Sequence, residues 1–255
     1  LVEVFREVRD VLKDDGVLWV NIGDSYYNYR PGTGGLPKQT VSRTSQDLPE
    51  QCNRRANKLD GLKEKDMIGI PWMLAFALRA DGWYLRQDII WHKPNPMPES
   101  VRDRCTKAHE YIFLLSKQRK YYYDNEAIKE PVKQDWGKRD RTSGKYHNPG
   151  TGLQPHSGLT KSYERKNKRD VWSVTNKPFK GAHFACFPPE LIEPCILAGS
   201  KKGDTILDPF MGSGTTAMVA KQHDRSYIGC ELNEQYGSLI QKRLKAIPTK
   251  LPFDM

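Results

Sequence analysis

Apolar and polar positions follow two different rhythms along the chain, and these rhythms divide it into helices and strands. Apolar residues recur at helical spacing in residues 1–12, which predicts a helix, and the apolar run at 17–22 predicts a buried strand. Further patterns predict helices near 71–79, 191–198 and 234–244 and strands near 84–91, 110–116, 205–207 and 226–230. We expect 84–91 and 110–116 to pair as an antiparallel edge, and the alternation of helices with strands predicts an α/β fold.

The stretch Asp208–Thr216, Asp-Pro-Phe-Met-Gly-Ser-Gly-Thr-Thr, leads from a strand through a glycine turn into a helix. Gly212 and Gly214 let the backbone approach a ligand closely, and the helix that follows directs free N–H groups at the same point. A phosphate-binding P-loop would have lysine where Thr215 stands, and the three-glycine spacing of dinucleotide sites is absent. The turn therefore predicts a ligand other than a nucleoside triphosphate.

Two acidic residues stand at the ends of successive predicted strands. Asp208 closes the first, and Glu231 closes the next one, about one β-α-β unit later. A carboxylate in the second position can accept hydrogen bonds from both ribose hydroxyls, and Asp208 suits a cation or an amino group. The pair predicts a nucleoside that carries a positive group. A strand-turn-helix unit that binds no ligand is the alternative.

These segments resemble the S-adenosylmethionine site of the DNA methyltransferases that act on amino groups, either N6 of adenine or N4 of cytosine. The resemblance implies a Rossmann-like class I S-adenosylmethionine-dependent methyltransferase fold in the circularly permuted, beta-class order of motifs. The segment at 181–190, before the glycine turn, resembles the part of the family that covers the methionine end of the cofactor. Ordinary packing at the start of a helix is the alternative. The implied cofactor residues are Asp208, Pro209, Phe210, Gly212, Ser213, Gly214, Thr215, Thr216, Glu231, His183, Phe184, Ala185 and Phe187.

Two other segments resemble the walls of the family's target-base pocket. One is the strand at 17–22 with the residues that follow it, and the other is the proline-rich stretch Trp-His-Lys-Pro-Asn-Pro at 91–96. A rigid proline loop with an aromatic and an amide side chain suits stacking and hydrogen bonding with an extruded base. The base-pocket candidates are Asp24, Trp91, Lys93 and Asn95. A turn role for Asp24 and a core position for Trp91 are the alternatives.

Charge and composition single out residues 117–180. Basic clusters alternate there with aromatic residues and glycines, and the whole chain has a formal net charge of +10 and a pI near 9.3, which favours a polyanionic partner. We interpret this stretch as a target-recognition insertion that contacts double-stranded DNA, with a solvated linker as the alternative. The candidate DNA-binding residues are Lys138, Arg139, Arg141, Arg165, Lys166, Lys168 and Arg169.

The insertion divides the expected methyltransferase domain into two halves. Residues 1–116 form the catalytic, base-pocket half, which is incomplete at its N-terminus and includes a mobile loop at 28–65, and residues 181–255 form the cofactor half.

The five cysteines form no Cys-x-x-Cys pair, which fits a reducing cytosol and argues against a zinc site, so we expect no metal. Without an apolar run of membrane-spanning length or a signal peptide, the chain predicts a cytoplasmic protein of a prokaryote or a phage, with no membrane partner.

The family's catalytic loop, an Asp, Asn or Ser followed by Pro-Pro and an aromatic residue, does not occur in the 255 residues. We expect it upstream of Leu1, so no catalytic residue is assigned and the resemblance does not imply that these 255 residues are active by themselves. The expected function is site-specific transfer of a methyl group to the exocyclic amine of a flipped base in double-stranded DNA. The His-Phe-Ala-x-Phe-Pro-Pro segment favours cytosine N4. Adenine N6 and a non-catalytic DNA-binding module are the alternatives, and a homodimer and a cognate restriction endonuclease stay open as partners.

Overall fold

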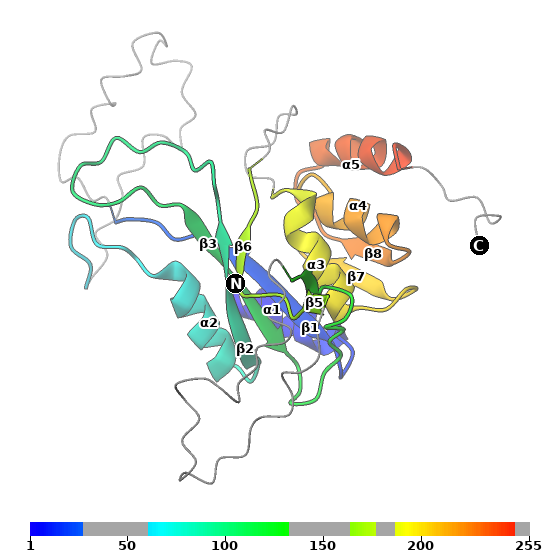
Figure 1. Cartoon of the computed structure of the whole chain (residues 1–255). Helices are drawn as coiled ribbons and strands as arrows, with labels where there is room; N and C mark the ends of the chain where they lie inside the picture. The colour runs from blue at the N-terminus through cyan, green and yellow to red at the C-terminus, as the bar shows by residue number, and fades with distance from the viewer. Residues whose placement is uncertain (28–60, 133–163, 177–186, 248–255) are drawn as a thin grey trace, which may run out of the picture.

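A four-stranded mixed sheet forms the centre of the larger half of the protein (Figure 1). Its order is β1 (Val17–Ile22), β3 (His109–Ser116), β2 (Tyr84–His92) and β6 (Val171–Ser173). β3 runs antiparallel to both of its neighbours, and β6 runs parallel to β2. The computed structural model describes residues 1–27, 61–132, 164–176 and 187–247.

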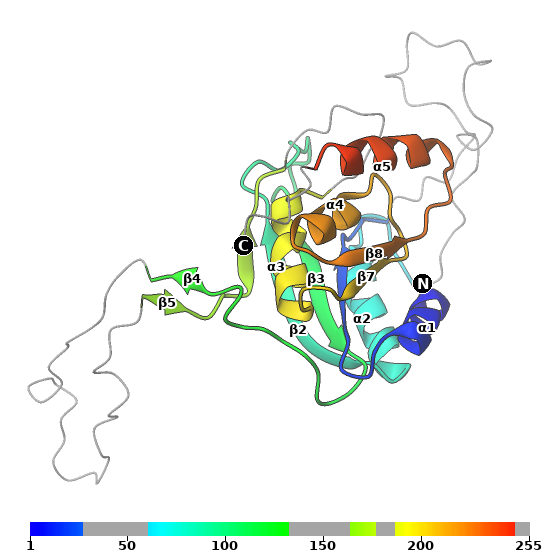
Figure 2. The same ribbon diagram turned by 90° about the vertical axis from the view of Figure 1, so that its right-hand side faces the viewer.

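Helices cover both faces of this sheet, because β3 is apolar on both sides. Phe113 and Leu115 face the core beneath α1 (Val2–Val11) and α2 (Ile70–Ala80), whereas Ile112 points to the opposite face. Alternate residues of a strand point to opposite faces, so one apolar run serves two cores. The second core is closed by α3 (Pro189–Gly199), which lies across the sheet from α1 and α2 (Figure 2).

A second, two-stranded sheet carries the glycine turn. β7 (Thr205–Asp208) and β8 (Ser226–Gly229) are parallel, and α4 (Thr215–Gln222) is the crossover between them. Ile206 of β7 packs into a core formed by α3 and α4. α5 (Gln235–Lys245) lies on the outside of α4 and closes the small apolar cluster around Met211 (Figure 1).

The helix at the start of the chain connects this second sheet to the first. Phe5 of α1 makes an edge contact with Phe210 in the glycine turn, with ring centroids 6.2 Å apart. Lys13 Nζ donates to Asp204 Oδ1 at 2.7 Å, just before β7. These contacts set the glycine turn at a defined place relative to the first sheet.

A short antiparallel pair, β4 (Glu130–Pro131) and β5 (Arg165–Lys166), extends away from the body of the protein (Figure 2). The pair continues in a hydrogen bond from Val132 N to Glu164 O, 3.0 Å long. It thus brings together the two ends of residues 133–163, which lie outside the described residues.

The helices and strands expected from the apolar pattern are present, and their bounds agree to within two residues. The predicted antiparallel pairing of 84–91 with 110–116 is confirmed. Their predicted position at the edge of the sheet is wrong, because β3 lies between β1 and β2 and β6 covers the outer side of β2. β6 falls within the stretch 117–180 that we interpreted as an insertion, and the domain bounds stay a prediction. Of the loop expected to be mobile, residues 61–65 are described, and Lys65 N donates to Tyr27 O at 2.9 Å. None of the described helices has the length and hydropathy to cross a membrane.

Candidate functional site

The glycine turn is attached to the end of β8 by backbone hydrogen bonds. Met211 N donates to Cys230 O at 2.8 Å, and Cys230 N donates to Asp208 O at 3.0 Å. Asp208 is paired in register with Gly229, and its Oδ1 accepts the N–H of Phe210 at 2.9 Å. The carboxyl ends of the two parallel strands and the turn therefore form one connected edge, which is where α/β sheets bind nucleotides.

Glu231 holds the tip of the turn from the neighbouring strand. Its Oε2 accepts the N–H of Gly212 at 2.7 Å, and its Oε1 accepts the N–H of Asn233 at 2.9 Å. Each carboxylate oxygen has a second lone pair, so the same side chain can also accept ribose hydroxyls. Both predicted acids, Asp208 and Glu231, thus stand at adjacent strand ends, as the nucleoside interpretation requires.

Glycine is needed at several positions of this edge for steric reasons. Gly212 and Gly214 have φ values of 52° and 78°, in the left-handed region that side chains disfavour. A Cβ at Gly214 would lie 3.1 Å from the side chain of Ile240, and a Cβ at Gly229 would lie 1.7 Å from Met211 Cε. The turn is therefore packed tightly against the protein from behind.

The two sides of the turn differ in exposure. Met211, Ser213 and Thr215 are buried, whereas Phe210 is 55% exposed and Glu231 is exposed. Among the other predicted cofactor residues, Gly214 is buried and Pro209, Gly212 and Thr216 are partly buried. The accessible groups of this edge are therefore the ring of Phe210 and the carboxylates of Glu231 and, in part, Asp208, and this set fits an adenosine that carries a cation.

The second predicted cofactor segment is described only at its end. His183, Phe184 and Ala185 lie outside the described residues. Phe187 is partly buried and packs against the cluster that contains Trp91, Trp172 and Leu191, directly before α3. This packing next to α3 agrees with a helix-entry role for Phe187. Its contact with the cofactor stays a prediction.

Asp24 and Trp91, two of the base-pocket candidates, have structural partners. Asp24 Oδ1 accepts the N–H groups of Gly69 and Ile70, both at 3.0 Å, and so caps the start of α2. Trp91 is 3% exposed, and its Nε1 donates to Val174 O at 2.9 Å. Trp91 thus has the core position that the sequence left as an alternative, whereas the distant helix cap made by Asp24 was not among the alternatives.

Lys93 and Asn95, the other two candidates, lie closer to the surface. Lys93 Nζ lies 4.3 Å from the centre of the Trp91 ring and forms a salt bridge with Glu110, which also accepts a hydrogen bond from Asn21. Asn95 exchanges hydrogen bonds with the backbone of Asn176, with its Oδ1 accepting at 2.9 Å and its Nδ2 donating at 3.0 Å. Asn95 therefore fixes the chain immediately before residues 177–186.

Sequence reasoning missed three residues that take part in these networks. Asn21 and Glu110 complete the Lys93 cluster, and a polar residue at the end of an apolar strand run was the available signal. Arg243 was missed because it is one of several basic residues in the last predicted helix. It is half-buried and reaches the glycine turn, where its Nη1 donates to Ser213 O at 2.7 Å.

The predicted DNA-binding residues are only partly described. Lys138, Arg139 and Arg141 lie outside the described residues. Among the described candidates, Arg169 and Lys166 form salt bridges with Glu130 of β4 at 2.7 and 3.5 Å. Burial alone would raise the pKa of Glu130, but the hydrogen bond and charge of Arg169, with Lys166, outweigh it and lower that pKa.

Arg165 and Lys168 use their charges differently. Arg165 is exposed and donates to the backbone of Lys129 at 2.8 Å. Lys168 is half-buried, with its Nζ 5.0 Å from the centre of the Trp172 ring. Neither contact pairs the positive charge with a carboxylate. Arg165 and Lys168 therefore suit phosphate contacts better than Lys166 and Arg169 do.

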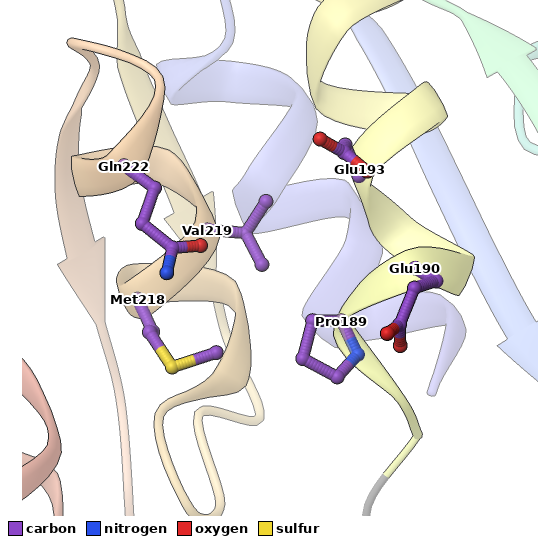
Figure 3. A pocket seen from close by; sticks show the side chains of 6 residues that line it. All are labelled: Pro189, Glu190, Glu193, Met218, Val219 and Gln222. Atoms are coloured by element: carbon purple, nitrogen blue, oxygen red, sulfur yellow. The ribbon is translucent and has the colours of Figure 1, made fainter. Parts of the chain in front are cut away.

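A cavity of about 320 Å³ lies in the groove between α3 and α4 (Figure 3). Its walls are Pro189, Glu190, Glu193, Met218, Val219 and Gln222. The cavity is lined by neither Asp208 nor Glu231, and it is separate from the strand ends that carry the predicted site. The cavity therefore does not bear on the predicted cofactor site, which rests on the residues at the strand ends.

Comparison with known proteins supports the same interpretation. Residues 1–242 match the N6/N4 family model described as DNA methylase. The chain is 47% identical to the type II methyltransferase M.Cfr9I of Citrobacter freundii over 98% of this chain and 72% of that protein. It is 48% identical to the type II methyltransferase M.SmaI of Serratia marcescens over 96% of this chain and 72% of that protein.

Two solved structures share the fold. The PvuII DNA methyltransferase, named as cytosine-N4-specific, aligns with a TM-score of 0.60 at 17% identity, over 98% of this chain and 72% of that one. The DNA modification methylase TTHA0409 of Thermus thermophilus, in complex with S-adenosylmethionine, aligns with a TM-score of 0.56 at 21% identity, over 95% and 74%. The predicted Rossmann-like methyltransferase fold is confirmed. The chain belongs to the N6/N4 DNA methylase family, enzymes that transfer a methyl group from S-adenosylmethionine to an amino group of a DNA base.

Proposed function

We propose that the protein methylates N4 of cytosine at a short specific site in double-stranded DNA and binds its cofactor at the edge formed by Asp208, the glycine turn and Glu231. The observation that carries the site assignment is the double role available to Glu231. Its carboxylate already fixes the N–H of Gly212 and has lone pairs left for a ribose. One side chain can therefore order the turn and bind the nucleoside.

Each residue of the proposed site has a distinct task. S-adenosylmethionine supplies an electrophilic methyl group on a positively charged sulfur. Glu231 would accept the ribose hydroxyls, and Asp208 would place a negative charge near the positive end of the cofactor. The exposed ring of Phe210, supported from behind by Phe5, offers an apolar surface. These residues bind and orient the cofactor, so that the methyl group is presented to the amine in line.

Cytosine N4 as the target rests on the His-Phe-Ala-x-Phe-Pro-Pro segment at 183–189, which resembles that of relatives with a Ser-Pro-Pro-Tyr catalytic loop. The cytosine-N4-specific PvuII enzyme has the same fold, although a likeness at 17% identity concerns the fold alone. Adenine N6 is the alternative from the same family. The two targets differ in one product nucleoside, which makes the choice directly measurable.

DNA contacts are assigned to the basic residues around β5 and β6. Arg165 and Lys168 are the strongest described candidates, because their charges are not engaged by Glu130. The relatives' names class them as type II methyltransferases, which suggests that this protein protects a site from a cognate restriction endonuclease in a bacterial cytoplasm. A homodimer stays a proposal.

The decisive experiment is methyl transfer from labelled S-adenosylmethionine to DNA by the protein expressed from its complete gene. Hydrolysis of the DNA and separation of the nucleosides should give labelled N4-methylcytosine. Labelled N6-methyladenine would replace the base assignment by its alternative. A catalytically active Glu231→Gln variant with unchanged KM for S-adenosylmethionine would show that the cofactor lies elsewhere.

A further inference from the structure

The buried side of the glycine turn is held by one side chain from α5. Arg243 Nη1 donates to Ser213 O at 2.7 Å and to Ser213 Oγ at 2.6 Å, and it lies 3.1 Å from Thr215 Oγ1. Ser213 and Thr215 are 3% and 4% exposed, so these oxygens are shielded from water. A charged donor binds buried acceptors more strongly than a neutral donor does. Arg243 therefore stabilises the conformation that the turn adopts.

The apolar face of α5 packs against the turn and so brings Arg243 close to it. Leu244 packs with Met211, and Ile240 lies against Gly214. Arg243 Nη2 also lies 3.8 Å from Met218 Sδ in the first turns of α4. The helix thus covers the back of the turn, on the opposite side from the exposed residues of the proposed cofactor site.

Two side chains therefore hold the turn from opposite sides. Glu231 binds the N–H of Gly212, and Arg243 binds the carbonyl and hydroxyl groups of Ser213. Gly212 and Gly214 give the segment wide backbone freedom, because glycine reaches left- and right-handed regions equally well. If only a fraction of the molecules has the binding conformation, the apparent dissociation constant rises by the inverse of that fraction. Loss of either contact should therefore weaken cofactor binding.

We propose that Arg243 is a positioning residue for the cofactor, which sets the glycine turn in its binding conformation without touching the ligand. The proposal rests on the assignment of the turn and Glu231 as the S-adenosylmethionine site. Arg243 contacts the three oxygen atoms through Nη1 and Met218 Sδ through Nη2, whereas a lysine has one ammonium nitrogen on a more flexible stem and cannot occupy both positions. Lysine should therefore replace Arg243 only in part.

The test uses the protein expressed from its complete gene. The Arg243→Met variant should bind S-adenosylmethionine at least about 10-fold more weakly in calorimetry and show a matching rise in the KM for this cofactor. The KM for DNA and the kcat at saturating cofactor should stay within about twofold, because the turn, once occupied, has its normal conformation. Arg243→Lys should recover part of the affinity. Lys242→Met, an exposed neighbour on α5, controls for the lost charge.

Glu231→Gln separates failure of this inference from failure of the site. If Glu231→Gln weakens cofactor binding while Arg243→Met behaves as Lys242→Met does, the site stands and the role of Arg243 is overturned. If neither variant changes the affinity, the cofactor site itself is misplaced and the inference falls with it. Should Arg243→Met fail to fold, Arg243→Lys decides: a raised KM for the cofactor alone supports the proposal, and an unchanged KM or a fall in kcat alone overturns it.

Discussion

Replacing Gly214 by alanine probes how tightly the turn is packed, and a second glycine supplies the comparison. Gly214 has a φ of 78°, and a Cβ there would lie 3.1 Å from both Cγ atoms of Ile240. Gly203, in the turn before β7, has a φ of 83°, but a Cβ there would meet nothing within 4 Å. The two substitutions impose the same backbone strain and differ in side-chain crowding.

The expected destabilisation follows from these two terms. A left-handed backbone costs a residue other than glycine about 1–2 kcal/mol, so Gly203→Ala should lower the free energy of unfolding by about that amount. Crowding in a packed site adds about 1–3 kcal/mol, which gives about 2–5 kcal/mol in all for Gly214→Ala. In an Ile240→Ala background the contacting atoms are gone, so Gly214→Ala should cost only the strain.

Urea unfolding of the wild type, Gly203→Ala, Gly214→Ala, Ile240→Ala and the Gly214→Ala/Ile240→Ala double variant measures these differences as midpoints at a constant m-value. Gly237→Ala in α5, where a Cβ would also meet nothing within 4 Å, should instead stabilise by about 0.5–1 kcal/mol, because alanine favours helix. The reasoning fails if Gly214→Ala is no more destabilising than Gly203→Ala. It also fails if Ile240→Ala leaves the cost of Gly214→Ala unchanged.

Three further predictions concern charges. Glu231→Ala should weaken S-adenosylmethionine binding by about 1.5–3 kcal/mol, roughly 10- to 150-fold in calorimetry, and wild-type affinity would contradict the ribose assignment. The hydrogen bonds from Lys13 and the backbone of Lys201 lower the pKa of Asp204 in the folded protein. The ionised Asp204 therefore stabilises the fold fully only above the pKa of an unfolded aspartate, about pH 4. Asp204→Asn should therefore lower the melting temperature at pH 7, and this difference should shrink as the pH falls through the depressed pKa; equal differences at pH 7 and pH 3 would refute it. Lys168→Ala should weaken DNA binding and reduce its salt slope by about 1, and an unchanged slope would remove Lys168 from the interface.

The sequence predicted most of the fold because apolar periodicity is a local property. Regular runs such as 17–22 and 205–207 identify strands wherever they lie in the chain. β6 was not predicted, because three residues, Val-Trp-Ser, carry too little periodicity among polar neighbours. It joins the sheet through Trp172, which is buried beside Trp91. Only contacts made in the folded chain distinguish this short strand from the loop around it.

The sequence identified candidate site residues from their chemical type, but it predicted only some of the contacts that they make. The glycine turn and Glu231 meet as expected, because a strand, a turn and a helix leave little choice of geometry. Asp24 has the residue type of a site residue, yet it caps a helix whose start, Gly69, is distant in the sequence. Arg243 has the residue type of a surface charge, yet it binds the turn. Such roles depend on the tertiary fold, which propensity and periodicity do not encode.

The contact between Phe5 and Phe210 joins the glycine turn, the proposed cofactor site, to the first helix of the chain. Phe5 is buried in the core beneath β3, and Leu207 packs against the same core from β7. The exposed Phe210 ring is therefore supported by Phe5, a residue of the predicted base-pocket half. Because the turn has Glu231 on one side, Arg243 on another and Phe5 beneath it, its position is determined by three separate elements. A turn fixed in this way suits the proposed function, which requires the cofactor to be held in a constant position relative to the predicted base-pocket half.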